Sequence, residues 1–259
     1  MKRLALFVTC LAELFAPEIA EQAAGLVARY ARAEVVLVGD GCCGQPAWNA
    51  GFPGEARALA RRLIPRLEAY DAVVVPSGSC ATMLLRYYPH LFAADSPMGR
   101  SAAALAARTH ELAAFLATRL PETAGDPVEP SADANTAFHP SCHSLRGARV
   151  GDAGERCLRA AGCGLALQQW SDECCGFGGL FAVKQEPLST AMADAKLNSL
   201  LASGAETVVS GELGCLLHLE GRARRRGLSL RFRHLAEVLA ELHQDPGDGD
   251  GDRGAADGN

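Results

Sequence analysis

Two pairs of adjacent cysteines stand in glycine-rich turns of this chain. Cys42 and Cys43 lie in GDGCCGQP, and Cys174 and Cys175 lie in DECCGFGG. The flanking Asp and Gly residues are typical of turns rather than of a packed core. A disulfide within a pair is unfavourable, because neighbouring Cα atoms are about 3.8 Å apart whereas relaxed disulfides need about 4.4–6.8 Å. The paired thiols are therefore candidates for metal or redox chemistry.

The cysteine spacing repeats along the chain. Eight of the ten cysteines form two sets of four, related by an offset of 132 residues for three members and 135 for the fourth. The first set is Cys10, Cys42, Cys43 and Cys80, and the second is Cys142, Cys174, Cys175 and Cys215. An internal repeat predicts a duplicated architecture. Cys157 and Cys163 have no counterpart in the first half, and we interpret them as packing residues.

The elements that must position these cysteines also repeat. In the first half, apolar runs predict strands that lead to Cys10, to the CCG turn and to Cys80, with helices over 17–32 and 54–70 between them. Pro65 is expected to kink or end the second helix. The second half shows the same order, with strands expected at 135–142, 165–176 and 206–215 and helices at 151–161 and 188–204. Each half therefore has a β-α-β-α-β pattern.

This pattern predicts an α/β fold made of two pseudo-symmetric, Rossmann-like halves with mainly parallel sheets. The carboxyl ends of parallel strands share one edge of a sheet, so the four cysteines of each half should converge there. Glycines beside the paired cysteines would let backbone N–H groups approach the sulfur atoms.

The domain boundaries follow from the repeat and from composition. We expect a first half over 1–120 that ends in a helical segment at 98–120, a linker at 121–135, a second half over 136–244 and a disordered acidic tail at 245–259. Within the second half, residues 216–227 should continue a helix, 228–234 should add a strand and 235–243 a last helix.

Composition narrows the classes of function. The chain has 259 residues, 49% of them hydrophobic, which is enough for a sizeable core, and its net charge of −5 gives no basic field for nucleic acid. No run of about 18 apolar residues predicts a membrane span. MKRLALFVTCLAELFA begins like a signal peptide, but Glu13 interrupts the run and Cys10 belongs to the repeat. Ten cysteines in a chain of this size favour metal or redox chemistry in a reducing compartment, so we expect a cytoplasmic protein.

Three chemistries could use four converging thiols. Structural zinc sites usually use CxxC knuckles, and no two cysteines here have that spacing. Thiol–disulfide exchange needs only one reactive thiol and one partner thiol. It therefore does not explain why four cysteines occur in each half of the chain. An iron–sulfur cluster needs several thiolates and tolerates long loops between them. We favour the iron–sulfur cluster, with a disulfide reductase and a zinc-stabilised interaction protein as alternatives.

The order C-x31-CCG-x35-C followed by C-x31-CCG-x38-C resembles the duplicated cysteine-rich CCG domain. That family includes the cysteine-rich component of heterodisulfide reductase and the iron–sulfur components of glycolate and lactate oxidation systems, and the resemblance covers roughly residues 4–240. PSGSC, GFGGLFAVK and SGELGC resemble its lactate-utilization branch. In the heterodisulfide branch each third segment reads CxxC, whereas Ser77 and Glu212 stand at the earlier position here. Each half therefore offers four cysteines rather than five.

The resemblance implies a function, a cofactor and a ligand set. It implies an iron–sulfur electron-transfer subunit that acts with two partner subunits to oxidise L-lactate to pyruvate. It also implies clusters of the [4Fe–4S] type at one or two sites, held by the eight repeated cysteines. A heterodisulfide-reductase-like thiol–disulfide reductase is the alternative from the same family. No catalytic base is assigned, and GFGG lacks the spacing of a dinucleotide-binding motif.

The second cysteine set has more polar neighbours than the first. His139 and His143 flank Cys142, Glu173 precedes the second pair and Glu212 lies near Cys215. Because Pro140 prevents a regular helix across the two histidines, we favour hydrogen bonds to sulfur over metal ligation for them. If one site contacts a substrate or a partner's redox centre, we expect it to be the second. The basic run RARRRG has two equal interpretations, an acidic partner or charge at a helix end.

Overall fold

The structure is a computed structural model that describes residues 1–120 and 134–243. The linker expected at 121–135 lies outside the described residues except for its last two positions, and the tail expected at 245–259 lies wholly outside them.

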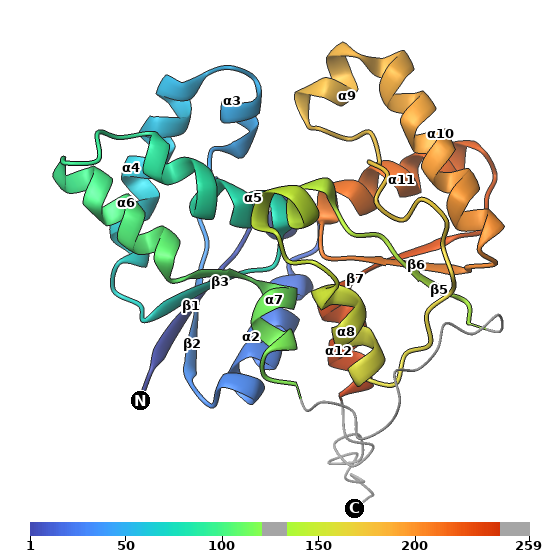
Figure 1. Ribbon diagram of the computed structural model, residues 1–259, viewed down its shortest axis with the longest axis horizontal. Coiled ribbons are helices and arrows are strands. Elements are labelled where there is room, and N and C mark those ends of the chain that lie inside the picture. The colour runs from blue at the N-terminus through green and yellow to red at the C-terminus, as the bar shows by residue number, and fades with distance from the viewer. Residues whose placement is uncertain (121–133, 244–259) are drawn as a thin grey trace, which may run out of the picture.

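The first half contains a four-stranded parallel sheet in the order β2-β1-β3-β4 (Figure 1). Its strands are β1 (Arg3–Phe7), β2 (Glu34–Val38), β3 (Ala72–Val75) and β4 (Thr109–Glu111). Its helices are α1 (Cys10–Phe15), α2 (Glu18–Ala31), α3 (Gln45–Asn49), α4 (Pro53–Leu67), α5 (Gly78–Thr82), α6 (Pro97–Ala107) and α7 (Leu112–Ala117), with a π-helical turn η1 (Met83–Tyr87) and a 3-10 turn η2 (Tyr88–His90) after α5. This sheet confirms the predicted β-α-β-α-β order.

The second half contains a three-stranded parallel sheet in the order β5-β6-β7. Its strands are β5 (Thr136–Phe138), β6 (Thr207–Ser210) and β7 (Arg231–His234). Its helices are α8 (Ala153–Ala160), α9 (Leu180–Lys184), α10 (Glu186–Ala202), α11 (Leu213–Arg225) and α12 (Leu235–Leu242), with a π-helical turn η3 (His143–Ala148) after β5. The α/β class with mainly parallel sheets is thus confirmed.

The two sheets show the repeat in their register. Ala5 of β1 pairs with Val73 of β3, and Ala137 of β5 pairs with Val208 of β6. These pairs are related by the same offsets as the cysteines. The repeat seen in the sequence is therefore a structural repeat.

Two predictions of secondary structure were wrong. The strand expected at 165–176 is irregular, and a single backbone bond, from Ala166 to the carbonyl of Thr136, joins its start to β5. Polar Gln168 and Gln169 interrupt the apolar run that strand formation needs. The helix expected at 98–120 is divided by β4, because Thr109–Glu111 pair with β3. Tertiary pairing overrides the helical preference of this segment.

The largest hydrophobic core joins the two halves. Helices α2 and α7 of the first half meet α8 and α12 of the second between the two sheets (Figure 1), and buried residues of all four helices form one apolar cluster with β1 and β6. Smaller clusters pack under α4 and α6 and under α10 and α11. Because they share a core, the halves are held against each other.

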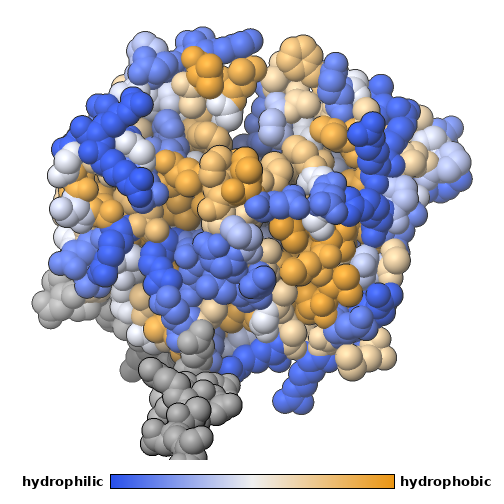
Figure 2. All heavy atoms as spheres, turned by 180° about the vertical axis from the view of Figure 1, so that it is seen from behind, coloured by the Kyte–Doolittle hydropathy of each residue, from blue (hydrophilic) through white to orange (hydrophobic). Residues whose placement is uncertain are grey.

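The surface between the outer lobes is hollowed. Figure 2 shows, from behind, apolar side chains gathered over the middle of the molecule and a gap between the two upper lobes. In Figure 1 these lobes carry α3 and α4 on one side and α9 and α10 on the other. Over the described residues, we find no helix with the length and apolar character needed to cross a bilayer.

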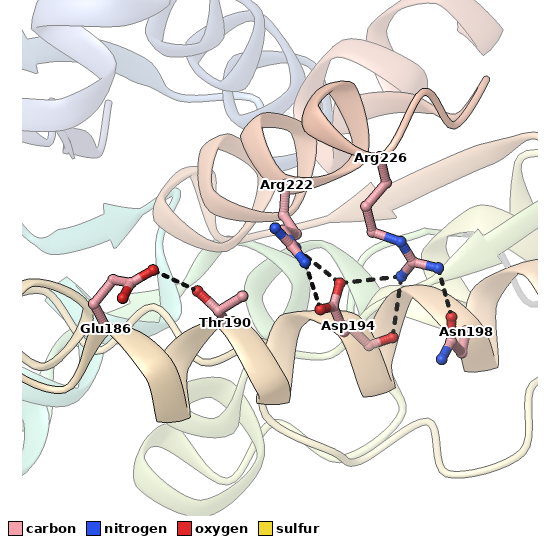
Figure 3. A network of polar contacts seen from close by, with 6 residues as sticks. All are labelled: Glu186, Thr190, Asp194, Asn198, Arg222 and Arg226. Atoms are coloured by element: carbon pink, nitrogen blue, oxygen red, sulfur yellow. Dashed lines mark hydrogen bonds and ion pairs between the residues drawn. The ribbon is translucent and has the colours of Figure 1, made fainter.

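The basic run at the end of α11 is largely paired within the chain. Arg222 donates two hydrogen bonds to the carboxylate of Asp194 on α10, at 2.8 and 2.7 Å, and Arg226 donates to the same carboxylate at 3.2 Å (Figure 3). Arg226 also donates to Asn198, and Arg224 pairs with Glu220. These arginines fasten α11 to α10 and to its own preceding turn, which favours the structural interpretation.

Candidate metal centre

The first and last cysteines of each half lie at the start of a helical turn that follows a strand. Thr9 caps α1 by accepting a hydrogen bond from the backbone of Ala12, and Cys10 is the first residue of that helix. Ser77 caps α5 and accepts from the backbone N–H of Cys80 at 3.3 Å. The first N–H groups of a helix have no partner within it and favour negative charge nearby. This location suits thiolates.

The paired cysteines are positioned by glycine turns of the same geometry. Gly44 and Gly176 both have φ of +87°, a conformation that other residues rarely adopt. Gly44 donates its N–H to the Sγ of Cys42, and Gly176 donates to the Sγ of Cys174, each at 3.4 Å. A Cβ at Gly176 would lie 2.5 Å from the carbonyl oxygen of Ser189. Each glycine therefore both shapes the turn and places an N–H against sulfur.

The sulfur atoms of each half converge. The Sγ atoms of Cys43 and Cys80 are 3.2 Å apart, and those of Cys175 and Cys215 are 3.0 Å apart. These separations exceed a disulfide bond length of about 2.05 Å, and all ten cysteines are free thiols. Two thiolates at this separation can bind the same metal ion.

Each half contains one cysteine that is stabilised as a thiolate. Hydrogen bonds from the thiols of Cys10 and Cys43 hold the pKa of Cys42 well below its ordinary value. In the second half, hydrogen bonds from Cys142 and Cys175 lower the pKa of Cys174 in the same way. The donor thiols show the opposite shift: hydrogen bonding to the neighbouring thiolate raises their pKa, and burial adds to it. Because thiolates rather than thiols bind metal ions, the lowered pKa values of Cys42 and Cys174 favour metal binding.

Cysteines of both halves line one cavity. The cavity has a volume of about 190 Å³ and is formed by the ends of the strands and the turns that follow them. It is lined by seven of the eight repeated cysteines, namely Cys10, Cys43, Cys80, Cys142, Cys174, Cys175 and Cys215. Sequence spacing predicted convergence within each half, but the shared cavity is a property of the tertiary structure.

His139 extends the second set of sulfur atoms. Its ring is fully buried, and neither ring nitrogen has a hydrogen-bond partner within the described part of the chain. One ring nitrogen of His139 and the Sγ atoms of Cys175 and Cys215 all lie within 4.8 Å of one another. Burial lowers the pKa of His139 to about 3, so the ring is neutral near pH 7.

Glu212 joins the two halves beside the cavity. Its carboxylate accepts hydrogen bonds from the Ser77 hydroxyl at 3.0 Å and from the backbone N–H of Ser79 at 2.7 Å. Glu212 and Ser77 occupy the corresponding position in the two halves, the position that separates this chain from the CxxC pattern. The sequence identified both residues, and only the structure shows that they bind each other.

The other two accessory residues have different surroundings. The Nδ1 of His143 lies 3.7 Å from the Sγ of Cys142, and its Nε2 lies 3.1 Å from the side-chain nitrogen of Gln45 in the first half. Glu173 is exposed and lines a separate open groove with Trp170. Of the four expected accessory residues, His139, His143 and Glu212 lie at the cysteines or the cavity, and Glu173 faces away from it.

Sequence reasoning missed a buried lysine. Lys196 of α10 is fully buried and donates to the backbone carbonyls of Ser171 at 2.8 Å and Trp170 at 3.3 Å, in the segment that leads to Cys174. Desolvation lowers its pKa to about 8. The available signal was its position in the helix beside the apolar residues Ala193, Leu197 and Leu200, which are buried with it.

The two cysteines outside the repeat lie away from the cavity. Cys157 is fully buried in the shared core, and its thiol donates to the carbonyl of Ala113 at 3.5 Å. Cys163 donates to the carbonyl of Gly164 at 3.7 Å. Both contacts agree with a packing role.

The donor set fits a thiolate-bound metal or cluster. Soft sulfur ligands favour iron–sulfur clusters, zinc and Cu(I) over hard cations. The unpartnered ring of His139 and the N–H groups that point at sulfur are what such a group requires around it. The fold and the site together define a duplicated α/β protein whose cysteine sets, one in each half, fit a thiolate-bound metal or cluster.

Comparison with known proteins places the chain in a family. The model of a family described as CCG, cysteine-rich domain, matches residues 4–85 and again 136–220. Lactate utilization protein A 2 of Bacillus cereus (strain Q1) is 34% identical over 242 residues, covering 92% of this chain and 98% of the relative. Lactate utilization protein A of Geobacillus kaustophilus is 38% identical over 238 residues, with the same coverage. The chain therefore belongs to the CCG cysteine-rich family, in the group of the lactate utilization A proteins.

One solved structure shows a weak likeness. A putative Asp/Glu racemase from Yersinia pestis aligns over 93% of this chain and 96% of its own, at 12% identity and a TM-score of 0.39. A TM-score of this size carries no argument about function.

Proposed function

We propose that this protein is an iron–sulfur electron-transfer subunit of a complex that oxidises L-lactate to pyruvate. The observation that supports it most is the single cavity lined by cysteines of both halves. Relatives that match nearly their whole length are named lactate utilization proteins. Two redox groups that share one cavity would be close enough to exchange electrons.

The ligands of the proposed clusters are the repeated cysteines. Cys10, Cys42, Cys43 and Cys80 would hold one cluster, and Cys142, Cys174, Cys175 and Cys215 the other, each of the [4Fe–4S] type. Such a group supplies one-electron transfer when bound. The chain itself positions the sulfur atoms at helix starts, directs glycine N–H groups at them and buries Cys43, Cys80, Cys175 and Cys215 away from water.

Oxidation of the hydroxy acid needs a further component. Conversion of lactate to pyruvate removes two electrons and two protons, and bond cleavage at the substrate carbon needs a cofactor that accepts them. We assign that step to a partner, and we expect two partner subunits. Exposed apolar residues follow the cavity-lining turns directly: Leu14 and Phe15 end α1 after Cys10, and Leu180 and Val183 lie in α9 after Gly179. Such residues at the rim of a site favour a partner interface.

The first experiment measures the cofactor. Protein purified without oxygen is assayed for iron, acid-labile sulfide and zinc, and its visible spectrum is recorded before and after dithionite. We expect iron with matching sulfide and a brown absorption that bleaches on reduction. Zinc in place of iron, or no metal after reconstitution, would overturn the proposal and favour the zinc-stabilised or disulfide alternative.

A second experiment tests the role in the complex. The loaded protein is mixed with its candidate partner subunits and L-lactate, and reduction of its cluster is followed by absorbance. Bleaching that requires lactate and the partners supports electron transfer from the acid. Turnover of a disulfide by the isolated protein, without lactate-dependent bleaching, would favour the thiol–disulfide reductase.

A further inference from the structure

The second site carries a polar residue where the first site has an apolar one. Phe7 and His139 occupy the same position, three residues before Cys10 and Cys142 respectively. Each lies one residue past the paired register, of β1 with β3 for Phe7 and of β5 with β6 for His139. Phe7 is fully buried and packs in one apolar cluster with Cys43 and Cys80. His139 is equally buried, beside Cys175 and Cys215. This pair of equivalent positions therefore places an apolar ring at the first site and a polar ring at the second.

The ring of His139 lacks the partners that a buried imidazole needs. Its backbone N–H bonds to the carbonyl of Val209 at 2.7 Å, but neither ring nitrogen has a partner among the residues described. A neutral imidazole carries one N–H donor, and leaving a buried donor unpaired is costly. The Sγ atoms of Cys175 and Cys215 lie within 4.8 Å of one ring nitrogen of His139. A group bound by these thiolates would supply the missing acceptor.

The buried ammonium of Lys196 near His139 does not serve as that acceptor. Lys196 of α10 is buried, and its positive charge lowers the pKa of the His139 ring. Its ammonium donates to the carbonyls of Trp170 and Ser171. An ammonium has three donors and no acceptor, so it cannot accept the N–H of His139. Cys174 is the other charged group that shifts the pKa of the His139 ring, and it is one of the four repeated cysteines of the second half.

We propose that His139 donates a hydrogen bond to sulfur of the iron–sulfur group at the second site and thereby makes that site easier to reduce than the first. This inference rests on the proposed function. Hydrogen bonds to cluster sulfur stabilise the more negative, reduced state and so raise the reduction potential. Phe7 offers no such donor at the first site. The second site would then hold the electron when both sites are available.

The test compares three full-length variants after cluster reconstitution. His139→Phe reproduces the first site, His139→Gln keeps a side-chain N–H donor, and Phe7→Leu is the matched apolar control in the first half. Iron and sulfide are counted for each variant, and reduction is followed by potentiometric titration with visible and electron paramagnetic resonance spectra. We expect the titration to show two redox components, one for each site. In His139→Phe the reduction potential of one component should fall by about 59 mV for one electron, which lowers its ratio of reduced to oxidised cluster about tenfold at a fixed potential. His139→Gln should restore much of the shift, and Phe7→Leu should leave both components in place.

The outcomes separate this inference from the proposed function. An unchanged titration in His139→Phe, with full iron and sulfide, overturns the role of His139 and leaves the electron-transfer function intact. Loss of iron from both His139 variants also overturns it, because His139 would then be needed to hold the group. Absence of iron in the parent protein overturns the proposed function itself.

Discussion

The hydroxyl of Ser77 lies 3.0 Å from a carboxylate oxygen of Glu212 and donates a hydrogen bond to it across the junction of the two halves. The two residues occupy the same position in the repeat, so equivalent positions of the two halves meet at this contact. Glu212 also accepts the backbone N–H of Ser79, and it is almost fully buried. This contact joins the starts of α5 and α11, the helices that carry Cys80 and Cys215.

Removing this contact should weaken the junction. We expect Glu212→Ala to lower the free energy of unfolding by about 2 kcal/mol, because the partly buried N–H of Ser79 and the buried hydroxyl of Ser77 lose their acceptor. Ser77→Ala should lower it by about 1 kcal/mol. Urea unfolding of the metal-free protein measures both, and the double variant should cost less than the sum. Glu220→Ala, which removes a surface pair with Arg224, is the control and should change stability by less than about 1 kcal/mol. Strict additivity of the two main variants would count against a direct contact.

Cys175→Ser tests ligation at the second site. Its Sγ lies 3.0 Å from that of Cys215, so its loss should remove about half of the bound iron and sulfide if both sites are filled. Circular dichroism should show the parent fold, since serine has nearly the same shape. Cys163→Ser is the matched control, because Cys163 lies outside the cavity. Equal iron content in Cys175→Ser and the parent protein would exclude Cys175 as a ligand.

Lys196 predicts a dependence of stability on pH. Its pKa of about 8 in the folded protein is below its ordinary value of 10.5, so between these pH values the unfolded chain binds more protons. Stability should therefore rise with pH from about 8 to 10.5, by up to about 3 kcal/mol. Lys196→Met removes this contribution, and the difference between parent and variant isolates it from thiol titration. A difference that stays constant over this range would show that Lys196 is not desolvated as the structure has it.

Gly78 predicts a steric limit where the halves meet. A Cβ at this position would collide with the Ser144 hydroxyl and lie 2.8 Å from the backbone nitrogen of Ser144, which is the second residue of η3. Gly78→Ala should therefore destabilise the protein by about 2 kcal/mol, measured by thermal or urea unfolding. Gly25→Ala is the control, because Gly25 lies exposed in α2 with open space around it and should gain about 0.5–1 kcal/mol. Similar effects of the two substitutions would contradict the close approach of α5 and η3.

The sequence by itself determined the local features of the site. Apolar runs, helix periodicity and glycine turns depend on neighbouring residues, so they predicted β1, β2, β3, β5, β6 and β7 and placed six of the eight repeated cysteines just after strands or in the turns that follow. Cys174 and Cys175 instead follow an irregular segment. The offset of 132 residues identified the duplication without any coordinates. The sequence also places Ser77, His139, His143 and Glu212 within three residues of a repeated cysteine.

The tertiary structure alone decided how these features meet. Whether Thr109–Glu111 form a strand depends on β3 as a neighbour. The contact between Ser77 and Glu212 joins residues 135 positions apart, and the burial of His139 depends on elements that pack around it from distant parts of the chain. Short-range patterns do not encode such contacts, because they form only when the shared core brings the two halves together.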